Sequence, residues 1–194
     1  IPYSAKKPIS TQADLQGMKI LDAGGPHFEI WKLLGASPVM LAIPEYYEAL
    51  SKGVADGVSQ TWAALLSFKL YENLKYWTDA PTRVAEFFIV MNLDKWNSLT
   101  PDVQKAIMSV SGMPGAEWAG DAGFGDDTRD ELLAVATKSG HPLEKVNIDP
   151  QEFEKWRQVG GKPVWDKWVA SMAAKGLPGQ KVMDNLLKLL SKYK

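Results

Sequence analysis

Two short stretches of the sequence combine groups that could bind a small ligand. In the first, Gly24-Gly25-Pro26 stands between an expected strand and an expected helix. Such a turn directs backbone N–H groups and the positive end of a helix dipole toward one point, where a carboxylate or phosphate is stabilised. In the second, Ser59, Gln60 and Thr61 precede Trp62. Polar side chains beside an aromatic ring are typical of a ligand-binding wall, but ordinary turn geometry also explains both stretches.

Two further side chains near these stretches have both a ligand-binding and a structural interpretation. Arg83 could hold a carboxylate through two parallel hydrogen bonds, whereas an isolated arginine more often forms a surface salt bridge. His27 stands in the first turn of the helix after the glycines, where we expect it to face solvent. His141, the other histidine, is expected in a plain loop.

The sequence gives no positive support for catalysis or for a bound metal. It contains no cysteine, and its two histidines do not stand at a ligand spacing. Ser59 is outside any G-x-S-x-G motif, and no nucleotide-binding glycine motif is present. The acidic residues within 126–131 have the pattern of a solvated helix face. We therefore predict a protein that is not an enzyme and needs no metal or other cofactor.

Composition and charge place the chain among globular proteins. Of its 194 residues, 45% are hydrophobic and 23% are charged, which is enough apolar material for a buried core. The formal net charge is -1 and the 22 lysines and arginines are scattered, so no surface for nucleic acid is indicated. The longest apolar runs, such as residues 87–91, are too short to span a bilayer.

The elements that must position these residues alternate between strands and helices in the first 70 residues. Short apolar runs predict strands at 18–21 and 38–43, and a short strand or turn before Trp62. Helix start and stop signals predict helices at 26–34, at 44–52 and after Trp62. This alternation is typical of βαβ units, so we predict an α/β fold with a largely parallel sheet.

The pattern changes after residue 82. Residues 83–92 are rich in strand-forming side chains and predict a long strand, and a helix is expected from Thr100 to Gly112. The segment 113–140 has helical propensity but contains several interrupting glycines. Further helices follow from residue 149, with breaks expected near 160–161 and 176–179.

Five motifs resemble the DctP-like extracytoplasmic solute receptors of the tripartite ATP-independent periplasmic (TRAP) transporters. They are "DLQGMKI", "LGASPVMLAIPEYYEALSKGVADG", "SFKLYENLKYWT", "FFIVMNLDKWNSLTPDVQKAI" and "FEKWRQVGGKPVWDKWVASMAAKGLPG", in family order. They extend over nearly the whole chain. The resemblance implies a two-lobed α/β periplasmic binding protein that closes on a small organic acid and delivers it to a membrane permease.

The resemblance also implies that most of one lobe lies outside this sequence, because family members are about half as long again. Residues 1–86 and 127–194 would form the second lobe, and residues 87–126 would cross to the first lobe. A lobe without its partner exposes apolar surface. The alternative prediction is therefore an interaction module that self-associates and binds no ligand.

One position departs from the family pattern in a way that bears on the ligand. Members usually carry an arginine that grips the ligand carboxylate, and the matching residue here is Leu21. Trp62 is retained, but the acid that follows it in one subgroup is Ala63. We therefore expect a less polar pocket, suited to a monocarboxylate with an apolar or aromatic body. The residues predicted to lie near this ligand are Gly24, Gly25, Phe28, Gln60, Trp62 and Arg83.

Overall fold

The structure, a computed structural model, describes residues 1–82 and 87–192. Its strands are β1 (Pro2–Ser4), β2 (Lys19–Asp22), β3 (Ser37–Met40), β4 (Gly57–Ser59), β5 (Tyr76–Thr78) and β6 (Glu144–Val146). Its α-helices are α1 (Gln12–Leu15), α2 (Pro26–Leu33), α3 (Tyr46–Ser51), α4 (Trp62–Ser67), α5 (Leu93–Asn97), α6 (Pro101–Ser109), α7 (Met113–Phe124), α8 (Asp126–Lys138), α9 (Pro150–Trp156), α10 (Lys162–Ala173) and α11 (Gly179–Leu190). Short helical turns lie at Ile43–Glu45, Leu70–Asn73 and Arg157–Gly161.

The described strands form one six-stranded sheet in the order β3-β2-β4-β1-β5-β6. β2 runs parallel to β3 and β4, and β5 runs parallel to β6. β1 is antiparallel to both of its neighbours, β4 and β5. Because β4 and β5 are both antiparallel to β1, they run in the same direction. β2 to β6 therefore all end at the same edge of the sheet, which we call the carboxyl edge. The predicted α/β fold is confirmed, although the antiparallel strand at its centre was not predicted.

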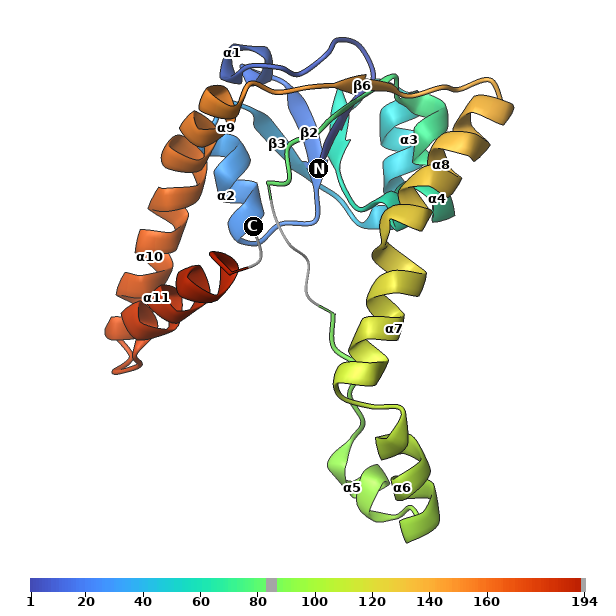
Figure 1. The fold of residues 1–194 in the computed structure, drawn as a ribbon. Helices are drawn as coiled ribbons and strands as arrows, with labels where there is room; N and C mark the ends of the chain where they lie inside the picture. The colour runs from blue at the N-terminus through green and yellow to red at the C-terminus, as the bar shows by residue number, and fades with distance from the viewer. Residues whose placement is uncertain (83–86, 193–194) are drawn as a thin grey trace.

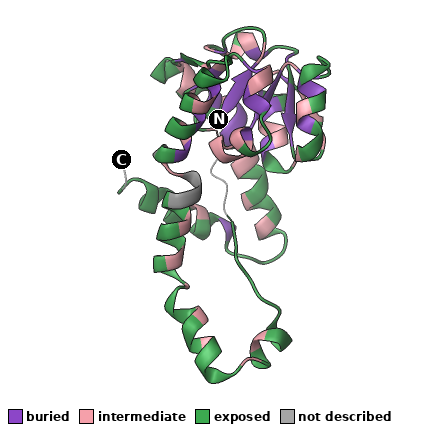
Figure 2. Ribbon diagram, turned by 90° about the vertical axis from the view of Figure 1, so that its right-hand side faces the viewer, coloured by how far each residue is buried: buried purple, intermediate pink, exposed green. Residues whose placement is uncertain are grey.

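Helices cover both faces of the sheet and enclose two hydrophobic clusters (Figures 1 and 2). α3, α4 and α8 lie on one face, over a cluster that includes Leu21, Trp77 and Leu132. α2 and α9 lie on the other, over a cluster that includes Ile20 and Trp156. Ile20 and Leu21 belong to different clusters because consecutive side chains of a strand point to opposite faces.

The predicted strand at 83–92 is wrong for the part that the structure describes. Residues 83–86 lie outside the described residues, and residues 87–92 are irregular. The side chains of Phe88, Ile89 and Val90 are 84%, 96% and 86% exposed. A strand needs a neighbour for its backbone hydrogen bonds, and in the described parts of the chain none pairs with this run. Together with α5, α6 and α7, it extends away from the sheet beyond the carboxyl edge (Figure 1).

Several glycines that were expected to interrupt helices do not. α7 continues through Gly115 and Gly120, and the helix from α9 continues into α10 through a π-helical turn that contains Gly160. A Cβ atom at Gly160 would lie 2.9 Å from Ile30 Cγ2, so this glycine lets the turn approach α2 closely. The break near 176–179 is confirmed, since Gly176 has φ = 70° between α10 and α11.

The contact between β1 and β4 depends on a glycine. A Cβ atom at Gly57 would overlap the carbonyl oxygen of Tyr3 and lie 2.7 Å from Met18 Cε. We predict that Gly57→Ala lowers the free energy of unfolding by about 1–3 kcal/mol, as overpacking of a fixed backbone does. Urea unfolding of the protein at its natural length measures this change.

Gly120→Ala is the matched control, because a Cβ atom at Gly120 would contact nothing within 4 Å in the described residues. Alanine replaces glycine favourably inside a helix, so this variant is expected to gain about 0.5–1 kcal/mol. Equal effects of the two substitutions would contradict the role given to Gly57.

Candidate functional site

The carboxyl edge of the sheet gathers the polar and aromatic residues singled out from the sequence. Gly24 follows β2, Gln60 follows β4 and Asp79 follows β5. Ile1 precedes the antiparallel β1 and therefore lies at the same edge, where its carbonyl accepts a hydrogen bond from Gln60 N at 3.3 Å. Open α/β sheets bind their ligands outside this edge. We therefore take it as the candidate ligand-binding site.

The glycine turn between β2 and α2 is confirmed as a position that needs glycine. Gly24 and Gly25 have φ values of 98° and 77°, in the left-handed region that side chains disfavour. A Cβ atom at Gly24 would also lie 2.9 Å from Met40 Cε. The Gly24 N–H donates to Asp22 Oδ1 at 2.9 Å, so this amide is used within the protein.

A buried polar network supports this turn from the side of α2. His27 Nδ1 donates to Asp22 Oδ2 at 2.6 Å, and Trp31 Nε1 donates to the same oxygen at 3.2 Å. His27 Nε2 lies 3.0 Å from the hydroxyl of Thr82. Asp22 and His27 are only 1% and 4% exposed. The prediction that His27 faces solvent is wrong, because the carboxylate that ends β2 binds its ring inside the fold.

The second predicted stretch forms a capped helix start beside an aromatic group. Thr61 Oγ1 accepts the Ala64 N–H at 3.2 Å, which caps α4. Trp62, half-buried, makes edge-to-face contacts with Tyr3 and Trp77 at centroid distances of 5.3 and 4.9 Å. Such geometry is favoured by the ring quadrupoles and fixes the orientation of Trp62. The turn interpretation is confirmed for Thr61. Trp62 packs against Tyr3 and Trp77, and its contact with a ligand stays a prediction.

The strand interior next to this wall is apolar. Leu21 is fully buried in the same cluster as Tyr3 and Trp77. Burial also raises the pKa of the Tyr3 hydroxyl well above its usual value, so this group stays neutral. The position that the family resemblance assigns to a carboxylate-binding arginine is thus occupied by core packing.

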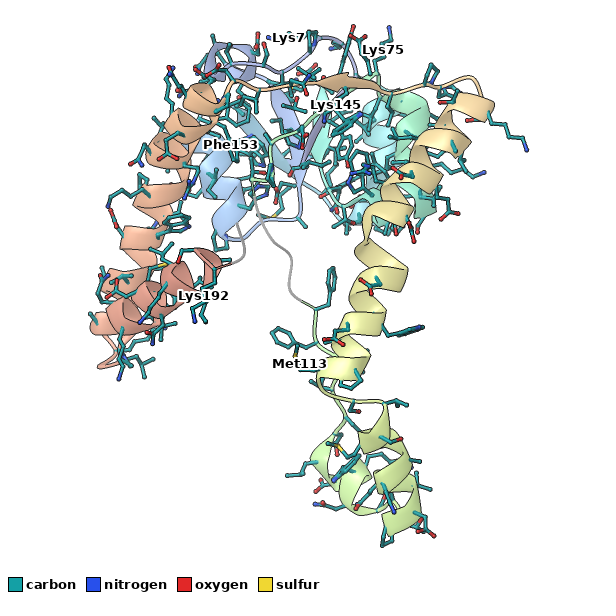
Figure 3. The ribbon with its side chains drawn as sticks, viewed as in Figure 1. Lys7, Lys75, Met113, Lys145, Phe153 and Lys192 are labelled. Carbon is teal, nitrogen blue, oxygen red and sulfur yellow. The ribbon has the colours of Figure 1, made fainter. Side chains whose placement is uncertain are left out.

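A hollow of about 470 Å³ lies at the carboxyl edge beside Trp62. It is lined by Ile1, Trp62, Trp77, Asp79, Arg129 and Lys145. Lys145, labelled in Figure 3 on β6, forms an ion pair with Asp79 at 2.7 Å. Its ammonium group lies 5.2 Å from the centre of the Trp77 ring. The hollow therefore combines aromatic surface with two cationic side chains.

A second hollow, of about 530 Å³, lies at the opposite edge of the sheet. Its lining comes from residues 72–76 and 140–144, and it includes His141. None of the residues predicted to contact a ligand lies there. Because ligands of open α/β sheets bind at the carboxyl edge, we do not assign the ligand to this hollow.

The structure brings most of the predicted site residues to one edge, in two groups. Gly24, Gly25 and Phe28 lie at the end of β2, and Gln60 and Trp62 lie at the end of the neighbouring β4. Phe28 is half-buried, with Lys32 Nζ 5.1 Å from its ring centre. Gln60 is 7% exposed, and its Oε1 accepts the Thr61 N–H at 3.2 Å. Arg83 lies outside the described residues.

Sequence reasoning missed Asp22, Trp77 and Arg129. Arg129 stands three residues before Leu132 and seven before Ala136, and this helical spacing could have placed it on a buried helix face. No sequence pattern marked Asp22 or Trp77. The role of Asp22 comes from the turn that brings Gly24, His27 and Trp31 to its carboxylate, and that of Trp77 from contacts with the distant Trp62 and Lys145.

Residues 1–82 and 87–192 contain neither a membrane-spanning helix nor a metal-binding cluster. No helix there is long and apolar enough to cross a membrane. No three histidine or acidic side chains there are grouped as a metal site requires.

Comparison with known proteins establishes the family. The model of bacterial extracellular solute-binding protein family 7, DctP, matches residues 2–172. The chain belongs to this family, which confirms the resemblance seen in the motifs.

Two solved structures and one curated relative show what the chain is similar to. A marine metagenome TRAP solute-binding protein from an unidentified microbe, specific for aromatic acids and bound to metahydroxyphenylacetate, is 27% identical with a TM-score of 0.85. The Bordetella bronchiseptica TRAP solute-binding protein with bound mandelate is 28% identical with a TM-score of 0.79. In both cases the match covers 100% of this chain and 60% of the other chain. The C4-dicarboxylate-binding periplasmic protein DctP of Rhodobacter capsulatus is 25% identical, over 92% of this chain and 52% of its own length.

The extent of these matches bears on the domain prediction. The chain spans about half the length of the curated relatives that it matches.

The buried network predicts a large effect for the loss of one carboxylate. Asp22→Ala leaves donors of Gly24, His27 and Trp31 without their acceptor, so we expect the free energy of unfolding to fall by about 3–5 kcal/mol. Denaturant unfolding measures it. Asp166→Ala is the matched control, since Asp166 pairs with Lys162 on the exposed face of α10. It should change stability by less than about 1 kcal/mol, and a comparable loss in both variants would contradict this account.

Proposed function

We propose that this protein is the solute receptor of a TRAP transporter. The receptor works in the periplasm, captures a small organic acid and delivers it to a membrane permease. The observation that carries the proposal is the family match over residues 2–172. The bound acids named for the similar solved structures support it. A receptor of this kind performs no catalysis and acts by closing on its ligand.

We infer further that the ligand is a monocarboxylate with an apolar or aromatic body. Leu21 is uncharged and fully buried, so this position supplies no cation for a second carboxylate. Trp62, half-buried and held by edge-to-face contacts with the buried Tyr3 and Trp77, supplies apolar surface at the same edge. Burying an unpaired carboxylate is strongly unfavourable, whereas an aromatic ring gains from such surface. The proposed ligand contacts remain Gly24, Gly25, Phe28, Gln60, Trp62 and Arg83.

The domain division stays a proposal of the same kind. Residues 1–86 and 127–194 would form one lobe, and residues 87–126 would pack on the other. The exposure of Phe87, Phe88, Ile89 and Val90 supports this, because contiguous exposed apolar side chains usually mark an interaction surface.

Isothermal titration calorimetry of the protein at its natural length tests the ligand class. We expect 3-hydroxyphenylacetate to bind and succinate to bind at least about 100-fold more weakly, because the second carboxylate would be buried without a partner. Tight binding of succinate with no binding of the aromatic acid would contradict the inferred ligand class and leave the receptor function intact.

The same exposed apolar side chains also support the alternative, a self-associating interaction module. The two functions differ in their melting behaviour. A receptor is stabilised by its ligand, whereas an assembly melts at a temperature that depends on protein concentration. Native mass spectrometry separates them directly: we expect a bound acid or a complementary lobe, and a ligand-free dimer would favour the alternative.

A further inference from the structure

Arg129 lies on the side of α8 that faces the sheet. It shares one helix face with Leu132 and Ala136, three and seven residues later, and both are fully buried. The Arg129 side chain is 34% exposed. It therefore lies where the buried face of α8 meets solvent, at the carboxyl edge of the sheet. A charged residue on this stripe is unusual, because apolar residues normally fill the core-facing side of a helix.

The Arg129 side chain lines the 470 Å³ hollow together with Trp62 and Trp77. Both cations of the hollow take part in ion pairs: Lys145 pairs with Asp79 and lies over the Trp77 ring, and Arg129 pairs with Asp130. Arg129 Nε donates to Asp130 at 3.0 Å, and Asp130 is itself exposed. A guanidinium carries five N–H donors in a planar fork, so it can bond to a neighbouring acid and also hold a carboxylate.

The surroundings connect this arginine with the change at Leu21. Leu21, Trp77 and Leu132 belong to one buried cluster, and Arg129 lies one helical turn before Leu132 at the edge of that cluster. Leucine at position 21 removes the cation that the family resemblance places on β2. Arg129 supplies a cation to the same edge from α8, beside the aromatic wall.

We propose that the hollow binds the carboxylate end of the ligand, with Arg129 as its cation and Trp62 against its apolar body. This proposal rests on the proposed receptor function and deepens it. In this proposal a residue of a helix binds the carboxylate of a monocarboxylic acid. The family resemblance instead implies that a residue of a strand binds it. Lys145 and Asp79 form the polar rim of the site.

Calorimetry with 3-hydroxyphenylacetate and its uncharged amide, 3-hydroxyphenylacetamide, tests the assignment on the protein at its natural length. Arg129→Gln should weaken binding of the acid at least about tenfold, as loss of a charge-assisted bidentate pair does. Binding of the amide should change by less than about twofold. Arg157→Gln is the matched control, because Arg157 pairs with Glu154 on an exposed part of the helix. It should leave both affinities unchanged.

The outcomes distinguish failure of the receptor function from failure of the Arg129 assignment. If the unaltered protein binds no organic acid, both the receptor function and the Arg129 assignment are overturned. If it binds the acid and Arg129→Gln behaves like Arg157→Gln, only the assignment is overturned. A crystal structure of the unaltered protein with 3-hydroxyphenylacetate tests the assignment without a variant that must fold. A carboxylate within about 3 Å of the Arg129 guanidinium supports the site, and one held elsewhere overturns it.

Discussion

The arrangement of the whole molecule depends on one three-residue strand. β1 pairs in antiparallel fashion with β4 on one side and with β5 on the other, and so joins two parallel groups of strands. Because both neighbours oppose β1, the carboxyl ends of the two groups point to the same edge. Otherwise the glycine turn and Trp62 would lie at one edge of the sheet, and Asp79 would lie at the opposite edge. The tight contact of Gly57 with the Tyr3 backbone keeps this junction closely packed.

The candidate site combines a hydrogen-bonded glycine turn on one side with an aromatic ring on the other. Asp22 joins the glycine turn to α2 through bonds to Gly24, His27 and Trp31, all in a setting where unpaired polar groups are costly. The aromatic side is held by ring contacts, which fix Trp62 without hydrogen bonds. A small ligand at this edge would therefore meet a fixed backbone turn and a fixed ring.

Local sequence patterns predicted the elements that their own residues determine. Pro26 and the glycines at 24, 25 and 35 were enough to place α2, because these residues restrict the backbone directly. β1 could not be predicted from three residues, since only its pairing with residues more than 50 positions away makes it a strand. The same reason explains the error at residues 87–92, whose strand-forming side chains have no strand beside them in the described structure. The burial of His27 depends on Asp22, five residues before it, and on Thr82, 55 residues after it.

The distribution of charge at the carboxyl edge follows from burial. A guanidinium at position 21 would lie among fully buried side chains and would require a complete set of partners to offset its desolvation. At position 129 the side chain can bury its aliphatic part against Leu132 while its charged end stays at the boundary with solvent. Desolvation of the charge is therefore smaller at position 129 than at position 21. Leucine at position 21 and arginine at position 129 are therefore each consistent with the burial of their positions. Together they support the proposed ligand, which has a single charge at one end of an apolar body.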